Sequence, residues 1–149
     1  MPPIPHKMNL KTISTIFLLS VTTIAIRSQS ASTPYKGIFE CKNARISLKL
    51  DAYQESVEVP GLSFLGKTHG YLNGMGIYGV WMITHCKKQG DAVQLRFSND
   101  TGSDAQTILF KQINDSTFLY KATGGNVIKK VQNRKLVKIE DTLEFKKIL

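Results

Sequence analysis

The chain has few of the side chains that build catalytic or metal sites. Its 149 residues include two cysteines and three histidines, and one of these histidines, His6, lies in the first thirty residues. The remaining cysteines and histidines lack the close pair spacing of zinc motifs. His85 and Cys86 are neighbours, and neighbouring side chains of a strand point to opposite faces, so they cannot form a Cys-His dyad. We therefore expect no catalytic residues, no metal and no cofactor, and we do not expect an enzyme.

The chain also lacks an apolar run long enough to cross a bilayer as a helix. Residues 13–26 (ISTIFLLSVTTIAI) would reach about 21 Å as a helix, short of the roughly 30 Å hydrocarbon core. Two lysines precede this run, the small polar residues SQSAS follow it, and the first thirty residues contain no acidic side chain. This order predicts a signal peptide over residues 1–30, with an uncleaved membrane anchor as the alternative. Export to the periplasm or the extracellular space follows from it.

Acidic residues are scarce relative to basic ones. The chain has 20 Lys and Arg against 11 Asp and Glu, and three of the 20 precede Ala31. Most of the remaining excess follows Tyr120, where eight basic residues face three acidic ones. This basic C-terminal part favours contact with anionic glycans, an acidic protein or a membrane surface, and the alternative is a solvated, solubilising surface. Nucleic acid is not expected, because no recognition helix or aromatic-rich basic strand is visible.

The two cysteines outside the expected signal peptide, Cys41 and Cys86, predict a disulfide. An even pair in an oxidising compartment is typically bonded. In the chain-entropy treatment, closing a loop of about 46 residues stabilises a fold by roughly 4 kcal/mol. Free buried thiols are the alternative.

Residues 31–149 show the period-two alternation of strands with one buried face. In residues 45–50 the apolar Ile46, Leu48 and Leu50 alternate with polar residues, and the same pattern returns in residues 92–97 and 142–147. Turn residues punctuate these runs at short intervals, which leaves little room for helices. The expected strands are 36–42, 45–50, 55–59, 76–86, 91–98, 105–111, 116–122, 126–132, 135–139 and 142–147. We predict a single all-β domain over residues 31–149, a small antiparallel meander barrel of about eight to ten short strands, with a β-sandwich as the alternative.

Residues 61–68 read GLSFLGKT and match the phosphate-loop pattern letter for letter. A phosphate loop requires a helix directly after it, because backbone amides and the helix N-terminus converge on the phosphates. The following HGYLNGMGIYG contains four glycines and cannot begin a helix. We therefore expect no nucleotide, and we interpret these glycines as turns, bulges or bends.

Residues 76–85 (GIYGVWMITH) are largely apolar on both strand faces. In a one-layer barrel, one face of such a strand fills the interior and the other meets solvent, a partner or a covering segment. Phe64 and Tyr71, upstream, add aromatic surface, so Phe64, Tyr71, Tyr78 and Trp81 form the candidate ligand or partner site. The alternative is that Trp81 is the largest core residue and GLSFL caps the barrel. Trp81 and Cys86 have opposite parity in this strand, so an inward Cys86 predicts an outward Trp81.

Residues 98–104 (SNDTGSD) resemble a calcium loop but lack the glutamate that would close it, so they predict a hairpin turn. Asn99 and Asn114 each begin an N-x-[ST] sequon, which matters only in a eukaryotic source.

Two resemblances follow from these patterns. The export signal, the meander of short strands and the late hairpin resemble small lipocalin-like barrels, which bind apolar molecules inside or partners at the mouth. The segments YKGIFEC and GMGIYGVW are similar to those of periplasmic inhibitors of C-type lysozyme, whose inhibitory loop carries Ser-Gly-x-x-Tyr; residues 74–78 retain glycine and Tyr78 but not the serine. The resemblances imply a non-enzymatic barrel that binds an apolar small molecule or an envelope component, or alternatively a protein inhibitor of a wall-degrading enzyme or toxin.

Overall fold

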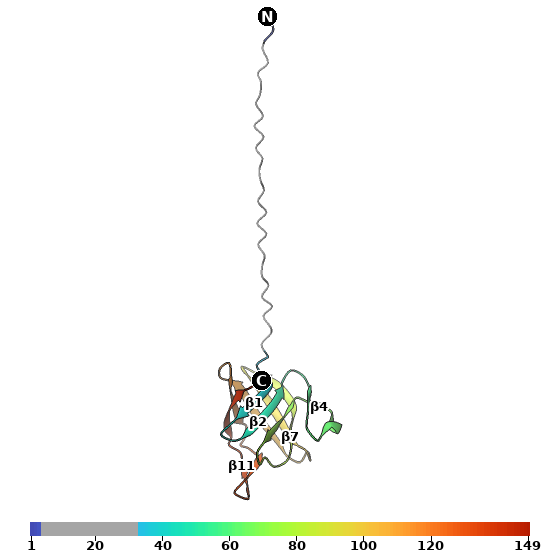
Figure 1. The fold of residues 1–149 in the computed structure, drawn as a ribbon, viewed down its shortest axis with the longest axis vertical. Helices are drawn as coiled ribbons and strands as arrows, with labels where there is room; N and C mark the ends of the chain where they lie inside the picture. Colours follow the sequence, from blue (N-terminus) through green and yellow to red (C-terminus); the bar gives the residue numbers. More distant parts are fainter. Residues whose placement is uncertain (4–32) are drawn as a thin grey trace. The chain divides into compact units, whose positions relative to one another are not determined.

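The computed structural model describes residues 1–3 and 33–149, and residues 33–149 form a closed antiparallel β-barrel (Figure 1). Eight strands surround the barrel in the order β1, β12, β9, β8, β7, β6, β5, β2. Their bounds are β1 Lys36–Cys41, β2 Ile46–Asp51, β5 Gly70–Gly74, β6 Trp81–Gln89, β7 Ala92–Asn99, β8 Ala105–Gln112, β9 Thr117–Ala122 and β12 Thr142–Lys147. The predicted all-β barrel is confirmed, and the sandwich alternative is wrong. The predicted signal peptide, residues 1–30, lies outside the described residues except for residues 1–3 and stays a prediction.

The barrel is a meander interrupted by two excursions. The first excursion joins β2 to β5 and contains β3 Val57–Glu58, the short 3-10 helix η1 Ser63–Leu65 and β4 Lys67–Thr68. The second joins β9 to β12 and contains a hairpin of β10 Lys129–Gln132 and β11 Lys135–Lys138. The hairpin leaves and rejoins the barrel where β1 ends and β6 begins, which we call the mouth end; the opposite end is the far end. Within residues 1–3 and 33–149, no helix has the length and apolar character needed to cross a bilayer.

Side chains fill the barrel interior. Alternate residues point inward as the sequence pattern predicts, and on β2 these are Ile46, Leu48 and Leu50, all buried. At the centre, the ring centroids of Phe39 and Phe118 are 4.8 Å apart, and those of Phe110 and Phe118 are 5.3 Å apart. Edge-to-face and stacked aromatic pairs of this kind stabilise a core beyond the apolar area that they bury.

The strand β5 is absent from the sequence prediction because its terminal glycines are typical of turns. In the structure these glycines allow a close approach of β5 to β2. A Cβ atom on Gly70 would lie 2.0 Å from the carbonyl oxygen of Lys49, and one on Gly74 would lie 2.7 Å from that of Arg45. The glycines therefore mark a close strand contact, and the predicted strand 76–86 begins only at Trp81.

A register shift in β6 changes the face that its side chains occupy. Ile83 lies opposite Phe97 of β7 and His85 lies opposite Arg96, so Thr84 is an extra residue. Such a bulge inverts the alternation that follows it. Trp81 is 4% exposed and belongs to the core, and Cys86 packs against that same core. The prediction that an inward Cys86 requires an outward Trp81 is wrong because it assumed an uninterrupted strand.

Both cysteines are free thiols, so the predicted disulfide is not formed. Cys41 ends β1 at the mouth end, and Cys86 lies in the half of β6 that runs toward the far end. The strands β2 and β5 also separate β1 from β6 around the barrel. A disulfide requires Cα atoms roughly 4.4–6.8 Å apart, which opposite ends of different, non-adjacent strands do not provide.

Candidate functional site

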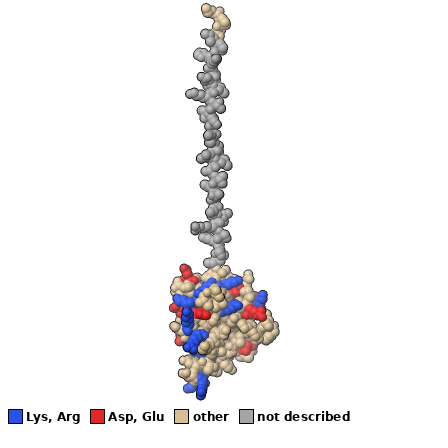
Figure 2. Space-filling view, in the orientation of Figure 1, with Lys and Arg blue, Asp and Glu red and all other residues tan. Residues whose placement is uncertain are grey.

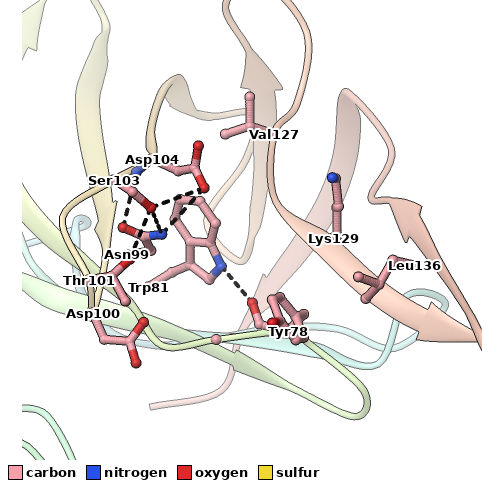
Figure 3. A pocket seen from close by; sticks show the side chains of 11 residues that line it. Tyr78, Trp81, Asn99, Asp100, Thr101, Ser103, Asp104, Val127, Lys129 and Leu136 are labelled. Carbon is pink, nitrogen blue, oxygen red and sulfur yellow. Dashed lines mark hydrogen bonds between the residues drawn. The ribbon is translucent and has the colours of Figure 1, made fainter.

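A cavity of about 510 Å³ opens at the mouth end (Figure 3). Its walls come from the start of β6 and the residues before it, the turn between β7 and β8, and the second excursion. The end of β7 lies beside the start of β6 because the two strands are antiparallel, with Trp81 opposite Asn99. We call this cavity the mouth pocket.

Trp81 and Tyr78 provide the aromatic part of the mouth pocket. The indole Nε1–H of Trp81 donates a hydrogen bond of 3.0 Å to the carbonyl oxygen of Tyr78, so the ring is fixed and its donor is satisfied. The amide of Tyr78 donates to the carbonyl oxygen of Lys129 at 2.9 Å, while its side chain is 63% exposed. The pocket therefore has a buried indole as its floor and a free phenol ring, on a fixed backbone, at its edge.

The turn between β7 and β8 supplies the polar wall. The Asn99 amide side chain donates to Ser103 Oγ at 3.0 Å, and its Oδ1 accepts from the backbone amide of Asp104 at 3.1 Å. These bonds fix the turn without using the carboxylate of Asp100. Among the hydrogen bonds and ion pairs of residues 33–149, none includes that carboxylate. Asp100 is therefore an exposed acceptor on a braced turn.

Gly79 lies beside both this carboxylate and the indole. A Cβ atom at Gly79 would lie 3.7 Å from Asp100 Oδ1 and 3.9 Å from Trp81 Nε1, and the φ angle of Gly79 is 79°. A larger residue here would be strained and would enter the pocket. Figure 3 shows Trp81 between the turn that carries Asp100 and the excursion that carries Lys129. The pocket thus offers an aromatic floor with an anionic wall on one side and a cation on the other.

The four aromatic residues predicted as a binding site divide into two groups. Tyr78 and Trp81 meet in the mouth pocket, whereas Tyr71 and Phe64 do not line it. Tyr71 lies opposite Met82 on the outer face of the barrel, where it borders a smaller groove with Val59. Phe64 lies in η1 and is 79% exposed.

The first excursion covers the outer face of β5 and β6, but not through GLSFL. Val57 and Val59 are buried, and β3 and β4 contact β5 and β6. Met82, on the outer face, is buried beneath this cover although it is not part of the barrel core. Phe64 and Leu65 remain exposed at the tip, so the expectation that GLSFL caps the barrel is wrong.

Residues 61–68 do not have the geometry of a phosphate loop. They form a turn, the helix η1 and the strand β4, and a further strand follows. The amides of Leu65 and Gly66 are already used, since they donate to the carbonyl oxygens of Leu62 and Ser63. Lys67 pairs with Glu58 in the β3–β4 ladder.

The two histidines of residues 33–149 lie outside the mouth pocket. His69 Nδ1 is 3.0 Å from the carbonyl oxygen of Asp51, and His85 Nδ1 is 3.2 Å from Thr84 Oγ1. Within the described part of the chain, no group of three or more His, Cys, Asp or Glu side chains is placed to hold a metal ion.

Sequence reasoning missed most of the polar and aliphatic lining, namely Asn99, Asp100, Thr101, Ser103, Asp104, Val127, Lys129 and Leu136. The sequence predicted the turn at residues 98–104, and the strand order of a meander could also have placed this turn in the pocket. In a meander the turn after β7 must lie at the same end as the start of β6, next to Trp81.

No known protein family, curated protein or solved structure matches the chain. The fold and the site therefore define its class: a small closed eight-stranded barrel with a mixed aromatic and charged pocket at its mouth.

Proposed function

We propose that the protein is an exported, non-enzymatic barrel that binds a saccharide-bearing component of the cell envelope in the mouth pocket. The observation that carries this proposal is the combination of the Tyr78 ring and the Trp81 indole with the unpaired Asp100 carboxylate. A sugar ring has an apolar C–H face that packs on an aromatic ring and a rim of hydroxyl donors that carboxylates accept. Pockets of a few hundred Å³ with an apolar lining and a few fixed polar groups are typical ligand sites.

The packed interior supports a site at the mouth and argues against an internal one. A lipocalin-like carrier needs space inside the barrel, but here the interior holds the rings of Phe39, Phe110, Phe118 and Phe145. An internal ligand would have to displace buried aromatic rings, each of which contributes several kcal/mol. Binding at the mouth leaves these rings in place.

The expected export places the barrel where envelope glycans occur, and the pocket's chemistry favours binding over catalysis. Asp104 takes part in the bracing of its own turn, with Asn99 Nδ2 3.4 Å from its carboxylate. Neither thiol nor histidine of residues 33–149 lines the pocket, so the Cys-His and Ser-His pairs of many hydrolases have no counterpart there.

The test uses Trp81 as its own reporter, because it is the only tryptophan of the chain. Soluble peptidoglycan oligosaccharides are added to the protein and its fluorescence is followed. Tyr78→Ala should weaken binding about ten-fold, because it removes one aromatic contact together with the hydroxyl group of that ring. Asp100→Asn should weaken it by a smaller factor. Tyr53→Ala, an exposed tyrosine at the far end, is the matched control and should bind as the wild type does.

Three results would contradict the proposal. They are an unchanged Trp81 signal with every oligosaccharide, an equal loss of affinity in Tyr53→Ala, and recovery of the oligosaccharide in cleaved form by mass spectrometry. The third would identify an enzyme instead.

The loop before β6 favours a second candidate function, inhibition of a wall-degrading enzyme. Met75 is 68% exposed and Tyr78 is 63% exposed, yet the backbone between them is fixed, since Gly76 accepts a 2.7 Å hydrogen bond from the amide of Val131. A rigid, exposed loop loses little entropy when it enters a partner's cleft. This is the segment that is similar to the inhibitory loop of periplasmic lysozyme inhibitors.

Met75 separates the two candidates, because it lies outside the mouth pocket. If the protein is an inhibitor, Met75→Ala should weaken inhibition of a C-type lysozyme and leave saccharide binding unchanged. If lysozyme activity is unaffected by an excess of wild-type protein, this candidate fails.

A further inference from the structure

The hairpin of β10 and β11 projects from the mouth end as a two-stranded ribbon (Figure 1). Lys129 pairs with Lys138, Lys130 with Val137, Val131 with Leu136, and Gln132 with Lys135. All of β11 is exposed, and β10 is exposed except at Lys130. We call residues 129–138 the ribbon.

The base of the ribbon is firmly anchored. Ile128 and Ile139 flank it, are buried in the barrel core, and are joined by a 2.9 Å hydrogen bond from the amide of Ile139. The β10 strand is also bound on its other side, where Lys129 accepts from the Tyr78 amide and Val131 donates to Gly76. The exposed arms are therefore held in a fixed position by a buried base.

The ribbon is strongly cationic. It carries Lys129, Lys130, Arg134, Lys135 and Lys138, and no acidic residue occurs between Ser116 and Ile139. None of the ion pairs recorded for residues 33–149 includes a ribbon residue. In Figure 2 the lower tip of the barrel domain, where Figure 1 shows β11, carries Lys and Arg side chains.

Apolar side chains lie between these cations. Val131 is 52% exposed and Val137 is 40% exposed, and Leu136 is half exposed. Directly paired residues share one face of a hairpin, so one face carries Val131 and Leu136 with Lys129 and Lys138, and the other carries Val137 with Lys130 and Lys135. Each face therefore combines apolar and cationic groups.

Two features of the ribbon oppose its own stability. Lys129 and Lys138 are directly opposed like charges, a destabilising cross-strand pair. The turn places Asn133 and Arg134 at φ angles of 50° and 63°, a pair of positions where asparagine followed by glycine is preferred. Arginine with its Cβ is disfavoured there. The chain thus holds a cation at the tip of the ribbon in an unfavourable conformation.

We propose that the ribbon docks the protein on an anionic lipid bilayer. An anionic headgroup layer would relieve the repulsion between Lys129 and Lys138, and the apolar region beneath it would accept Val131, Leu136 and Val137. A bilayer presents the same chemistry to both faces of a projecting ribbon. A shaped protein partner is disfavoured, because residues 129–138 contain no aromatic side chain of the kind that anchors protein interfaces.

The experiment measures co-sedimentation of the full chain with phosphatidylcholine vesicles that contain or lack phosphatidylglycerol. The wild type should bind the anionic vesicles more tightly than the vesicles without phosphatidylglycerol, and added salt should weaken this difference. The double variant Lys130→Gln, Lys135→Gln should bind anionic vesicles about twenty-five-fold more weakly. Each cation near an anionic surface contributes about five-fold to the affinity. Neither residue lines the mouth pocket, so saccharide binding should be unchanged.

The matched control is Lys87→Gln with Lys88→Gln, which removes the same charge from two exposed lysines of β6. It should bind anionic vesicles almost as the wild type does. All variants share the same N-terminus, so any contribution of the first thirty residues cancels in the comparison.

Two further variants separate docking from folding and from simple charge attraction. Arg134→Gly should weaken vesicle binding about five-fold while raising the stability of the protein, because glycine suits the positive φ angle. Val131→Thr with Val137→Thr keeps size and strand propensity and should also weaken vesicle binding.

The proposal is overturned if the wild type does not bind anionic vesicles, or if the Lys87 and Lys88 pair loses as much affinity as the ribbon pair. It is also overturned if the two threonine substitutions have no effect while soluble polyglutamate binds the ribbon as well as vesicles do. That last result would identify an acidic protein partner.

Discussion

Asp51 shows how one side chain fixes the point where the chain leaves the barrel. Its buried carboxylate accepts hydrogen bonds from the amides of Tyr53 and Gln54 and from Ser56 Oγ at 2.6 Å, and Lys36 Nζ lies 2.9 Å away. Burial alone would raise the pKa of Asp51, but the hydrogen bonds from Ser56, Lys36 and the Tyr53 amide outweigh it. The pKa therefore lies below its ordinary value of 3.8.

This lowered pKa predicts a pH-dependent contribution to stability. In the unfolded chain the carboxylate takes up its proton near pH 3.8, whereas in the folded protein it does so at lower pH. The contribution is complete above pH 3.8 and is lost as the pH falls through the folded value. Urea unfolding of the wild type and Asp51→Asn should therefore differ most at about pH 7 and converge as the pH falls through the lowered pKa of the folded protein. Asp115→Asn, at an exposed turn, is the control, and a difference that persists undiminished in acid would contradict the account.

Tyr120 and Asn126 form a buried polar contact at the start of the second excursion. The Tyr120 hydroxyl donates to Asn126 Oδ1 at 2.9 Å, and Asn126 Nδ2 donates to the carbonyl oxygen of Glu140 at 2.9 Å. Burial raises the pKa of Tyr120, so its hydroxyl remains a neutral donor throughout the physiological range.

Tyr120→Phe should lower the free energy of unfolding by about 1–3 kcal/mol, because it leaves Asn126 Oδ1 buried without a donor. Tyr78→Phe removes the same atom from an exposed ring whose hydroxyl makes no hydrogen bond within residues 33–149, and it should change stability by less than about 0.5 kcal/mol. Urea denaturation at neutral pH measures both. Equal values for the two variants would show that the buried hydrogen bond contributes nothing.

At the scale of elements, the sequence predicted those strands whose alternation is regular. Residues 46–50, 92–97 and 142–147 lie in β2, β7 and β12, as expected. The pattern could not reveal β5, because the close contacts that require its glycines involve Lys49 of β2 and Arg45, which directly precedes β2. It could not reveal the bulge at Thr84 either, since an extra residue is visible only against the register of β7.

The free thiols on β1 and β6 give a direct test of the strand arrangement. Protein purified without reductant and then denatured should release two thiols per chain, and Cys41→Ser should release one. In the folded protein at about pH 8, Cys86 should react slowly with a thiol reagent. Burial, with a smaller contribution from the charges of Asp51 and Glu55, raises the pKa of Cys86 to about 12. Absence of free thiols in the denatured protein would mean that the two strands can bring their cysteines together.

The structure of residues 61–68 predicts that replacing Lys67 changes neither the stability of the protein nor its binding of ATP. The side chain is exposed, and the segment's amides are already bonded within the turn. Lys67→Ala should therefore change the free energy of unfolding by less than about 0.5 kcal/mol. Calorimetric titration with ATP should give no heat of binding for either protein. ATP binding by the wild type that Lys67→Ala abolishes would restore the phosphate-loop interpretation.

At the scale of the whole molecule, the sequence predicted the aromatic residues of the candidate site but not its charged residues. Tyr78 and Trp81 could be chosen because their segment is apolar on both faces and aromatic side chains often line binding sites. The residues that complete the pocket come from two places: Asp100 lies on the turn that β6–β7 pairing puts beside Trp81, and Lys129 lies on an excursion whose backbone bonds to Tyr78. The strand order also separates Cys41 from Cys86, which residue types alone could not show.

The filled interior leads to the last prediction, which distinguishes a mouth binder from an internal carrier. Phe110 is fully buried and packs against Phe39, Phe118 and Phe145, so Phe110→Ala should open an apolar cavity and lower the free energy of unfolding by about 3–5 kcal/mol. Phe64→Ala removes the same ring from an exposed position and should cost less than about 0.5 kcal/mol.

Benzene then reports whether the interior has space, because an engineered dry cavity binds it and gains stability from it. Benzene should raise the melting temperature of Phe110→Ala and leave that of the wild type and of Phe64→Ala unchanged. If benzene stabilises the wild type as much as Phe110→Ala, the barrel already contains room for an apolar guest. The ligand would then belong inside the barrel, and the aromatic and charged groups at the mouth would border its entrance.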